Sequence, residues 1–226
     1  MNSVQLVSTG DGSHSLMNTE LQETYHSVHG AVQESKHVFI KHGLEDYLAN
    51  HPGKAIRILE MGFGTGLNAF LTFLQAPQHR VEVYYESWEK YPLSDSIVGQ
   101  LNYSGILGDE KAFNAIHQAA WNEAVQIQPG FSLFRKHGDI LTDSIASSFD
   151  IIYYDAFAPS KQPELWTIDI LKKIVDVMTP GGVWVTYCAK GQLKRDLASL
   201  GLIVETLQGP PGKKEMTRAR RPLEAP

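Results

Sequence analysis

The stretch IRILEMGFGTGLNAF, residues 56–70, decides the fold. Its first half is an apolar run typical of a buried strand and its second half begins a helix, so a glycine-rich turn joins the two. Gly62, Gly64 and Gly66 let the backbone bend tightly and approach a ligand beside unpaired helix amides. The dinucleotide spacing G-x-G-x-x-G would require glycine where this chain has Leu67. The turn therefore predicts a ligand site other than a nicotinamide site.

Strands and helices alternate on both sides of this turn. The apolar, β-rich runs occupy residues 55–62, 81–88, 131–140, 149–157, 181–189 and 201–209, and the helix-like stretches occupy residues 32–49, 67–75, 93–101, 109–120, 164–178 and 191–200. This order predicts an α/β fold with a doubly wound, mostly parallel sheet and helices on both faces. We expect one globular unit, with a β-rich and helical extension at residues 1–52 that closes over the active site of a domain at residues 53–226.

Composition narrows the class of protein. The chain has 226 residues, of which 42% are hydrophobic, enough for the core of one large domain. It starts without a signal-peptide pattern and has no apolar run near the roughly 20 residues of a membrane helix, so we expect a cytoplasmic protein with no membrane partner. Cys188 is the single cysteine, which excludes an internal disulfide and a thiolate zinc cluster.

Charge is unevenly distributed although the formal net charge is −5. Residues 186–226 hold 8 Lys and Arg against 4 Asp and Glu, and this basic end is either a phosphate-binding surface or a solvated tail. The basic side chains that would form the surface are those of Lys190, Lys194, Arg195, Lys213, Lys214, Arg218, Arg220 and Arg221. Four histidines between residues 26 and 42 fit no common metal motif, so no metal is expected.

Acidic residues follow the predicted strands, where ligands of such sheets bind. Glu60 precedes the glycine turn, and Glu89 or its neighbour Glu86 would bind ribose hydroxyls, depending on where the second strand stops. Asp139 would either bind an adenine amino group or cap a turn. Asp155 ends a strand apolar enough to be buried, where an acid has a polar purpose.

The spacing E-x-G-x-G-x-G resembles motif I of the Rossmann-like methyltransferases. The resemblance implies a seven-stranded sheet and S-adenosylmethionine as cofactor, with its amino acid and ribose near the turn. The predicted cofactor-binding residues are Glu60, Met61, Gly62, Gly64, Gly66, Asn68, Glu89, Asp139 and Asp155.

Several separated motifs resemble the MnmD-type tRNA wobble-uridine methyltransferases, which also form the methyltransferase half of the bifunctional MnmC proteins. They are DGSHSLMNTELQETYHSVHGAVQESKHVF, LEMGFGTGLNAF, WEKYPL, DAFAPSKQPELW, GGVWVTYCAKGQLKRDLASLGL and GKKEM. The resemblance implies N-methylation of the 5-aminomethyl group of uridine 34, with the tRNA anticodon loop as partner. Pro210 and Pro211 depart from the glycine and basic residues expected before the last motif. The sequence ends without a second glycine fingerprint, so we expect it to accept the aminomethyl nucleoside and not a carboxymethyl precursor.

The same resemblance suggests residues for the substrate side. Asp155 is the candidate catalytic residue, either accepting a hydrogen bond from the amine or facing only the cofactor. The predicted substrate-binding residues are Tyr25, His26, Glu34, Phe157, Pro159, Lys161, Lys213 and Lys214. Trp166 is available for stacking on a base, although a place in the core is favoured. The alternatives are a methyltransferase or aminopropyltransferase acting on a small amine, a non-catalytic RNA-binding protein, and a nicotinamide dehydrogenase.

Overall fold

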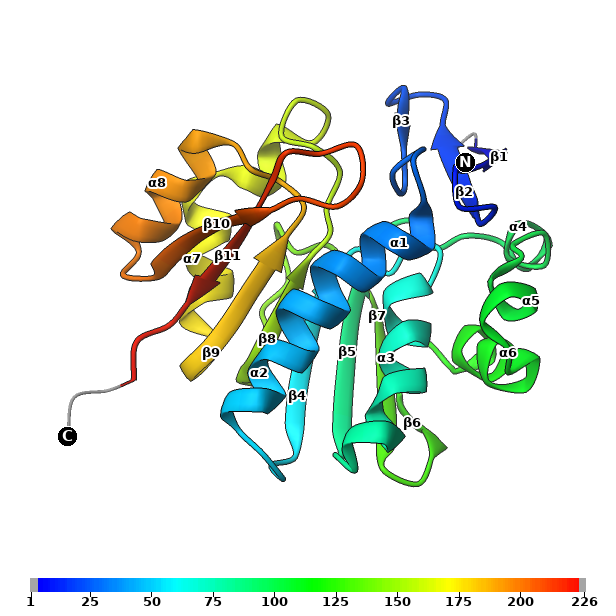
Figure 1. The fold of residues 1–226 in the computed structure, drawn as a ribbon, viewed down its shortest axis with the longest axis horizontal. Helices are drawn as coiled ribbons and strands as arrows, with labels where there is room; N and C mark the ends of the chain where they lie inside the picture. The colour runs from blue at the N-terminus through cyan, green and yellow to red at the C-terminus, as the bar shows by residue number, and fades with distance from the viewer. Residues whose placement is uncertain (1–3, 224–226) are drawn as a thin grey trace.

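The computed structural model describes residues 4–223 and centres on an eight-stranded sheet. Its strands are β4 (Ile56–Met61), β5 (Val83–Glu89), β6 (Ala124–Gln128), β7 (Phe131–His137), β8 (Phe149–Tyr154), β9 (Met178–Thr186), β10 (Ile203–Gln208) and β11 (Glu215–Arg220). The spatial order is β10-β11-β9-β8-β4-β5-β7-β6 (Figure 1). The central strands from β7 to β9 run parallel, while β6, β10 and β11 pair antiparallel at the two edges. The predicted doubly wound, mostly parallel sheet is confirmed.

Helices cover both faces of this sheet. They are α3 (Leu67–His79), α4 (Asp95–Val98), α5 (Tyr103–Leu107), α6 (Glu110–Gln118), the 3₁₀ turn η2 (Pro163–Trp166), α7 (Ile168–Asp176) and α8 (Gly191–Ser199). Along β4, Ile58 packs in a core with α3, whereas Leu59 and Met61 pack in a second core with α7 and α8. Successive side chains of a strand point to opposite faces, so a strand covered on both faces is apolar throughout.

The N-terminal region adds a small sheet and a long helix. The antiparallel strands β1 (Val4–Ser8), β2 (His14–Asn18) and β3 (Glu23–Thr24) lie above one end of the large sheet (Figure 1). The helix runs through α1 (Ala31–Ser35), the π-helical segment η1 (Lys36–Glu45) and α2 (Asp46–Asn50) and crosses the face that also carries α3. Phe39 and Leu44 of this helix share a hydrophobic core with Ile58. The division at residue 52 stays a prediction.

Three details differ from the prediction. The sheet has eight strands and not seven, because β6 adds an antiparallel edge beside β7. The helix expected at residues 164–178 is a 3₁₀ turn followed by α7, and Met178 already begins β9. The basic end forms strand β11 between β10 and β9, so it is not a solvated tail. Over residues 4–223, every helix is too short or too polar to cross a membrane.

Candidate active site

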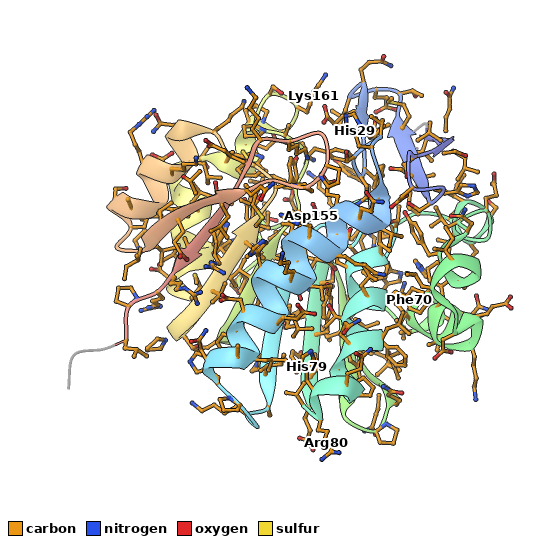
Figure 2. The ribbon with its side chains drawn as sticks, viewed as in Figure 1. His29, Phe70, His79, Arg80, Asp155 and Lys161 are labelled. Carbon is orange, nitrogen blue, oxygen red and sulfur yellow. The ribbon has the colours of Figure 1, made fainter. Side chains whose placement is uncertain are left out.

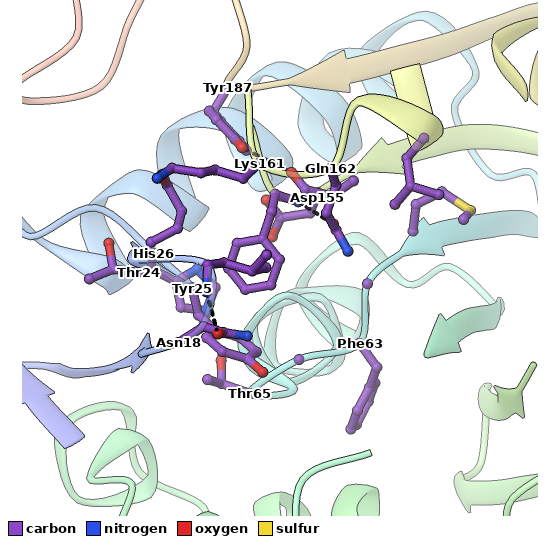
Figure 3. A pocket seen from close by; sticks show the side chains of 18 of the residues that line it. Asn18, Thr24, Tyr25, His26, Phe63, Thr65, Asp155, Lys161, Gln162 and Tyr187 are labelled. Atoms are coloured by element: carbon purple, nitrogen blue, oxygen red, sulfur yellow. Dashed lines mark hydrogen bonds between the residues drawn. The ribbon is translucent and has the colours of Figure 1, made fainter. Parts of the chain in front are cut away.

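A cavity of about 550 Å³ opens at the carboxyl ends of β4, β5 and β8 (Figure 3). Segments 18–29, 155–165 and 212–213 enclose its other sides. Of the predicted site residues, those that line it are Tyr25, His26, Glu34, Met61, Gly62, Gly64, Asn68, Glu89, Asp155, Phe157, Lys161 and Lys213. Glu60, Gly66, Asp139, Pro159 and Lys214 do not line it. The fold thus brings most predicted residues to one place.

The glycine turn forms the floor of this cavity. Gly62, Gly64 and Gly66 have φ values of 93°, 49° and 70°. These positive values lie in a region of backbone conformation that residues with a Cβ atom rarely adopt. A Cβ atom on Gly62 would lie 3.1 Å from the carbonyl oxygen of Asp155, and one on Gly64 would lie 3.0 Å from the ring of Tyr25. Two of the glycines are therefore needed both for backbone conformation and for close approach of neighbouring segments.

Glu89, and not Glu86, points into the cavity. Glu89 ends β5 and accepts hydrogen bonds from the amides of Gly64 at 3.0 Å and Tyr91 at 2.8 Å. Glu86 lies on the opposite face of β5, where its carboxylate accepts a hydrogen bond from the indole of Trp88 at 2.8 Å. Of the two acids, Glu89 is therefore the one whose carboxylate could accept from a ligand bound beside the glycine turn.

Asp155 follows β8 and faces the same cavity. One carboxylate oxygen, Oδ2, accepts a hydrogen bond of 2.8 Å from the Asn68 amide, which leaves Oδ1 for another donor. Burial raises the pKa of Asp155 well above its ordinary value, and the negative charge of nearby Glu34 raises it further. An acid in this state favours a cation or a hydrogen-bond donor as its next partner.

A second acid, Glu34, reaches the cavity from the N-terminal helix. One oxygen accepts a hydrogen bond of 2.9 Å from the Ser27 amide, and the other lies 2.6 Å from the ammonium of Lys213. The Lys213 ammonium also lies 3.9 Å from the centre of the Tyr187 ring. Tyr187, which the sequence reading missed, lines the cavity just beyond the end of β9. Its position after a strand is the signal that would have found it.

The N-terminal segment is tied directly to the glycine turn. The His26 ring lies 2.7 Å from the hydroxyl of Thr65, another lining residue that the sequence reading missed (Figure 3). Burial lowers the pKa of His26 to about 4, so the ring is neutral at pH 7. Tyr25 packs edge-on against Phe157 with ring centres 5.0 Å apart. The Tyr25 ring therefore lies between Gly64 of the glycine turn and Phe157 of the loop that follows β8.

Several predicted residues have other partners. Asp139 pairs with Lys90 at 2.8 Å and accepts from the Leu141 amide, as a turn cap does, while Ile140 and Leu141 line the cavity. Trp166 is buried against Tyr154 and belongs to the core. Among residues 4–223, His, Cys, Asp and Glu side chains form no group of three or more that could hold a metal ion.

Several basic side chains expected on a C-terminal surface have structural partners instead, whereas Lys190, Arg195 and Lys214 are exposed. Arg218 and Arg220 both pair with Asp46 and Glu205 across the edge of the sheet. Arg221 donates to backbone carbonyls, and Lys194 pairs with Glu215. Arg218 and Arg220 make these contacts because β11 pairs with a strand on each side.

The residues around the cavity fit S-adenosylmethionine. Glu89 holds a carboxylate beside the glycine turn that could accept from ribose hydroxyls, and Gly62 and Gly64 line the cavity without a side chain. Trp88, Ile140 and Leu141 offer apolar surface for an adenine ring. Asp155 and Glu34 supply negative charge for a sulfonium and an amine.

Comparison with known proteins agrees with this fit. The model of a family described as S-adenosyl-L-methionine-dependent methyltransferases matches residues 114–222. The bifunctional MnmC proteins of tRNA 5-methylaminomethyl-2-thiouridine biosynthesis from Cupriavidus metallidurans and Ectopseudomonas mendocina are each 30% identical to the chain. These alignments cover 88% and 86% of this chain, which spans 31% of the length of either relative.

Two solved structures share the fold over nearly the whole chain. MnmC2 from Aquifex aeolicus superposes with a TM-score of 0.76 at 28% identity, covering 100% of this chain and 72% of that one. Spermidine synthase from Thermotoga maritima superposes with a TM-score of 0.52 at 13% identity, covering 96% of this chain and 72% of that one, which shows a shared fold alone.

Fold, glycine turn and cavity together define an S-adenosylmethionine-dependent methyltransferase with a Rossmann-like domain. Within that class, the chain is similar to the MnmC proteins over one part of their length and to MnmC2 of Aquifex aeolicus over its own full length, which supports the MnmD-type methyltransferases as its relatives.

Proposed function

We propose that this enzyme methylates the primary amine of 5-aminomethyluridine at position 34 of tRNA, giving 5-methylaminomethyluridine or its 2-thio form. The observation that carries the proposal is that Asp155 lines the cavity while Asn68 holds one of its carboxylate oxygens. The names of the curated relatives, which refer to tRNA 5-methylaminomethyl-2-thiouridine biosynthesis, support the nucleoside.

The chemistry asks little of the protein beyond alignment and proton removal. When bound, S-adenosylmethionine supplies a methyl group on a sulfonium, which an amine lone pair attacks as the carbon–sulfur bond breaks and sulfur keeps its electron pair. A primary amine is largely protonated at neutral pH, so it must lose a proton before its lone pair is available. Asp155 would accept that proton through Oδ1 and hold the nitrogen toward the methyl group.

The charge of the cavity favours an amine over an acid. Asp155 and Glu34 face the same space, and Lys213 already pairs with Glu34. A cationic aminomethyl group would balance this excess of carboxylates, whereas a carboxymethyl group would add to it. This charge supports the aminomethyl nucleoside as substrate.

On the RNA side, Tyr25 and Phe157 would pack on the splayed uracil, since both rings line the cavity between turn and loop. Lys161 lines the cavity and lies near the top of the molecule in the view of Figure 2, and exposed Lys214 lies on the loop next to Lys213. Both would contact backbone phosphates. These assignments remain proposals.

The test is methyl transfer from labelled S-adenosylmethionine to tRNA that carries 5-aminomethyluridine, followed by nucleoside analysis. Label should appear in 5-methylaminomethyluridine, and Asp155→Asn should slow transfer by about 100-fold or more. The matched control is Asp169→Asn, an exposed acid in the first turn of α7. Label on putrescine or another small amine, with none on tRNA, would show instead a transferase for small amines.

A further inference from the structure

Glu60 is a buried acid that the proposed reaction does not use. It lies on β4 in register with Ser87 of β5 and Tyr153 of β8, and its side chain is fully buried. The hydroxyl of Ser87 donates to its Oε2 atom at 2.5 Å. Glu60 does not line the cavity, although the motif that contains it suggested contact with the cofactor.

Three buried oxygen atoms beside Glu60 have no hydrogen-bond partner among the described residues, and one of them is the hydroxyl of Tyr85, which also acts on the Glu60 carboxyl. The other two are Oε1 of Glu60 and Oδ1 of Asn68, and the Asn68 side chain is likewise one of the groups that act on the Glu60 carboxyl. Both oxygens are acceptors when Glu60 is ionised, so they cannot bond to each other. One proton on the Glu60 carboxyl would satisfy both with a single hydrogen bond.

That proton is present at neutral pH because burial raises the pKa of Glu60 to about 8. The titratable groups that face Glu60 are Tyr85 and Glu89 from β5 and Tyr153 and Asp155 from β8. Glu89 and Asp155 are acids and oppose ionisation, whereas the Tyr85 hydroxyl favours it. From α3, the Asn68 side chain faces Glu60 and does not titrate; together with the Ser87 and Tyr85 hydroxyls it lowers the pKa of Glu60, against the larger effect of burial.

The orientation of the Asn68 amide depends on this proton. Its NH₂ group donates to Asp155 Oδ2 at 2.8 Å, so its carbonyl must face away from Asp155. A protonated Glu60 donates to that carbonyl and stabilises this orientation, whereas an ionised Glu60 would attract the NH₂ group and draw it from Asp155.

We propose that Glu60 is a positioning residue: in its neutral form it orients Asn68, which in turn holds the Asp155 carboxylate toward the substrate amine, and it does not bind the cofactor. This inference rests on the proposed role of Asp155 in methyl transfer. The chain of contacts runs from Ser87 through Glu60 and Asn68 to Asp155 along one face of the sheet.

The test compares Glu60→Gln with Glu86→Gln, which changes a buried acid on the opposite face of the adjacent strand. A glutamine at position 60 can accept from Ser87 and donate to Asn68 at every pH. Titration calorimetry of S-adenosylmethionine should therefore give dissociation constants within about twofold of the wild type for both variants. A loss of about tenfold or more in Glu60→Gln alone would overturn the proposal, because the Glu60 charge would then bind the cofactor.

Two further measurements separate positioning from a merely structural role. Infrared spectra at pH 7 should show a protonated carboxyl band that weakens in Glu60→Gln and not in Glu86→Gln; equal spectra would overturn the proposal. In the wild type, kcat for tRNA methylation should decline above about pH 8, and Glu60→Gln should lack this decline while Glu86→Gln keeps it. If kcat of Glu60→Gln still declined above about pH 8, the decline would not come from ionisation of Glu60 and the proposal would be overturned.

The calorimetric and infrared measurements need no RNA. If the wild type binds cofactor and shows the Glu60 band but labels no tRNA, the proposed function fails. The infrared result still shows that Glu60 is protonated and can donate to Asn68. If tRNA is labelled and the band does not depend on Glu60, the inference fails alone.

Discussion

The ammonium group of Lys213 lies 2.6 Å from a carboxylate oxygen of Glu34, although 179 positions separate the two residues. Glu34 belongs to α1 and Lys213 to the loop between β10 and β11. Both residues line the cavity, so a helix from the N-terminal part of the sequence and a loop from the C-terminal part meet at the candidate active site.

Replacing Lys213 with methionine should destabilise the protein. Glu34 has 6% of its side chain exposed and would keep a charge without its partner. Removing one partner of a buried pair costs about 3–5 kcal/mol, and partial exposure of Lys213 reduces this to about 2 kcal/mol. Urea unfolding measures the loss. Lys214→Met, at the exposed neighbouring position, should change the unfolding free energy by less than about 0.5 kcal/mol. Equal effects of the two variants would show that the Glu34 pair does not stabilise the fold.

Glu89→Gln should weaken cofactor binding. A neutral amide can no longer accept hydrogen bonds from two ribose hydroxyls while also accepting those from Gly64 and Tyr91. Hydrogen bonds to a charged group contribute about 1.5–3 kcal/mol, which corresponds to a loss of affinity of about 10- to 150-fold. Equilibrium dialysis with labelled S-adenosylmethionine provides the measurement. An unchanged dissociation constant would remove Glu89 from the cofactor site.

Arg218→Ala should lower stability and leave tRNA affinity of the folded protein intact. The Arg218 guanidinium bonds to Asp46 at 2.6 Å and to Glu205 at 2.7 Å, joining the N-terminal helix to the sheet edge. Its loss leaves two partly buried acids without this partner, and we expect a cost of about 2 kcal/mol. Denaturant unfolding measures the loss of stability, and filter binding measures the affinity for tRNA. Arg195→Ala on exposed α8 is the control for stability. If the Arg218→Ala protein were as stable as the wild type but bound tRNA more weakly, Arg218 would instead be a tRNA-contacting residue.

The free energy of unfolding should fall as pH drops from 6.5 toward 4. Burial holds the pKa of His26 at about 4, so the unfolded chain gains a proton in this interval while the folded chain does not. A shift of this size corresponds to about 3 kcal/mol, fully present above pH 6.5. His26→Gln should reduce the slope of unfolding free energy against pH by about one proton in urea titrations. His79→Gln at the exposed end of α3 should keep the wild-type slope. If His26→Gln had the same slope of unfolding free energy against pH as the wild type, the His26 ring would not be buried and neutral in the folded protein.

Local patterns were sufficient for the class of fold. The run 56–70 specified a strand, a glycine turn and a helix, because apolar periodicity and positive φ angles are properties of neighbouring residues. Placing ligands at strand ends then predicted the region of the cavity, which Gly62, Gly64 and Asp155 do line.

Local patterns failed where partners are distant in sequence. Alternation put either Glu86 or Glu89 toward the cleft, and only the end of β5 against the turn decided for Glu89. The strand β6 at the edge and the charged strand β11 inside the sheet owe their positions to the strands they pair with. The contacts of Arg218 therefore could not be read from its basic surroundings.

By itself, the sequence determined the alternating α/β pattern and the glycine turn, because hydrophobic period and backbone conformation act over a few residues. Only the tertiary structure decided that Lys213 meets Glu34, that Glu60 lies beneath the cavity and that Asp155 faces into it. The physical reason is that the direction and burial of a side chain depend on the register of neighbouring strands and on the segments packed against them.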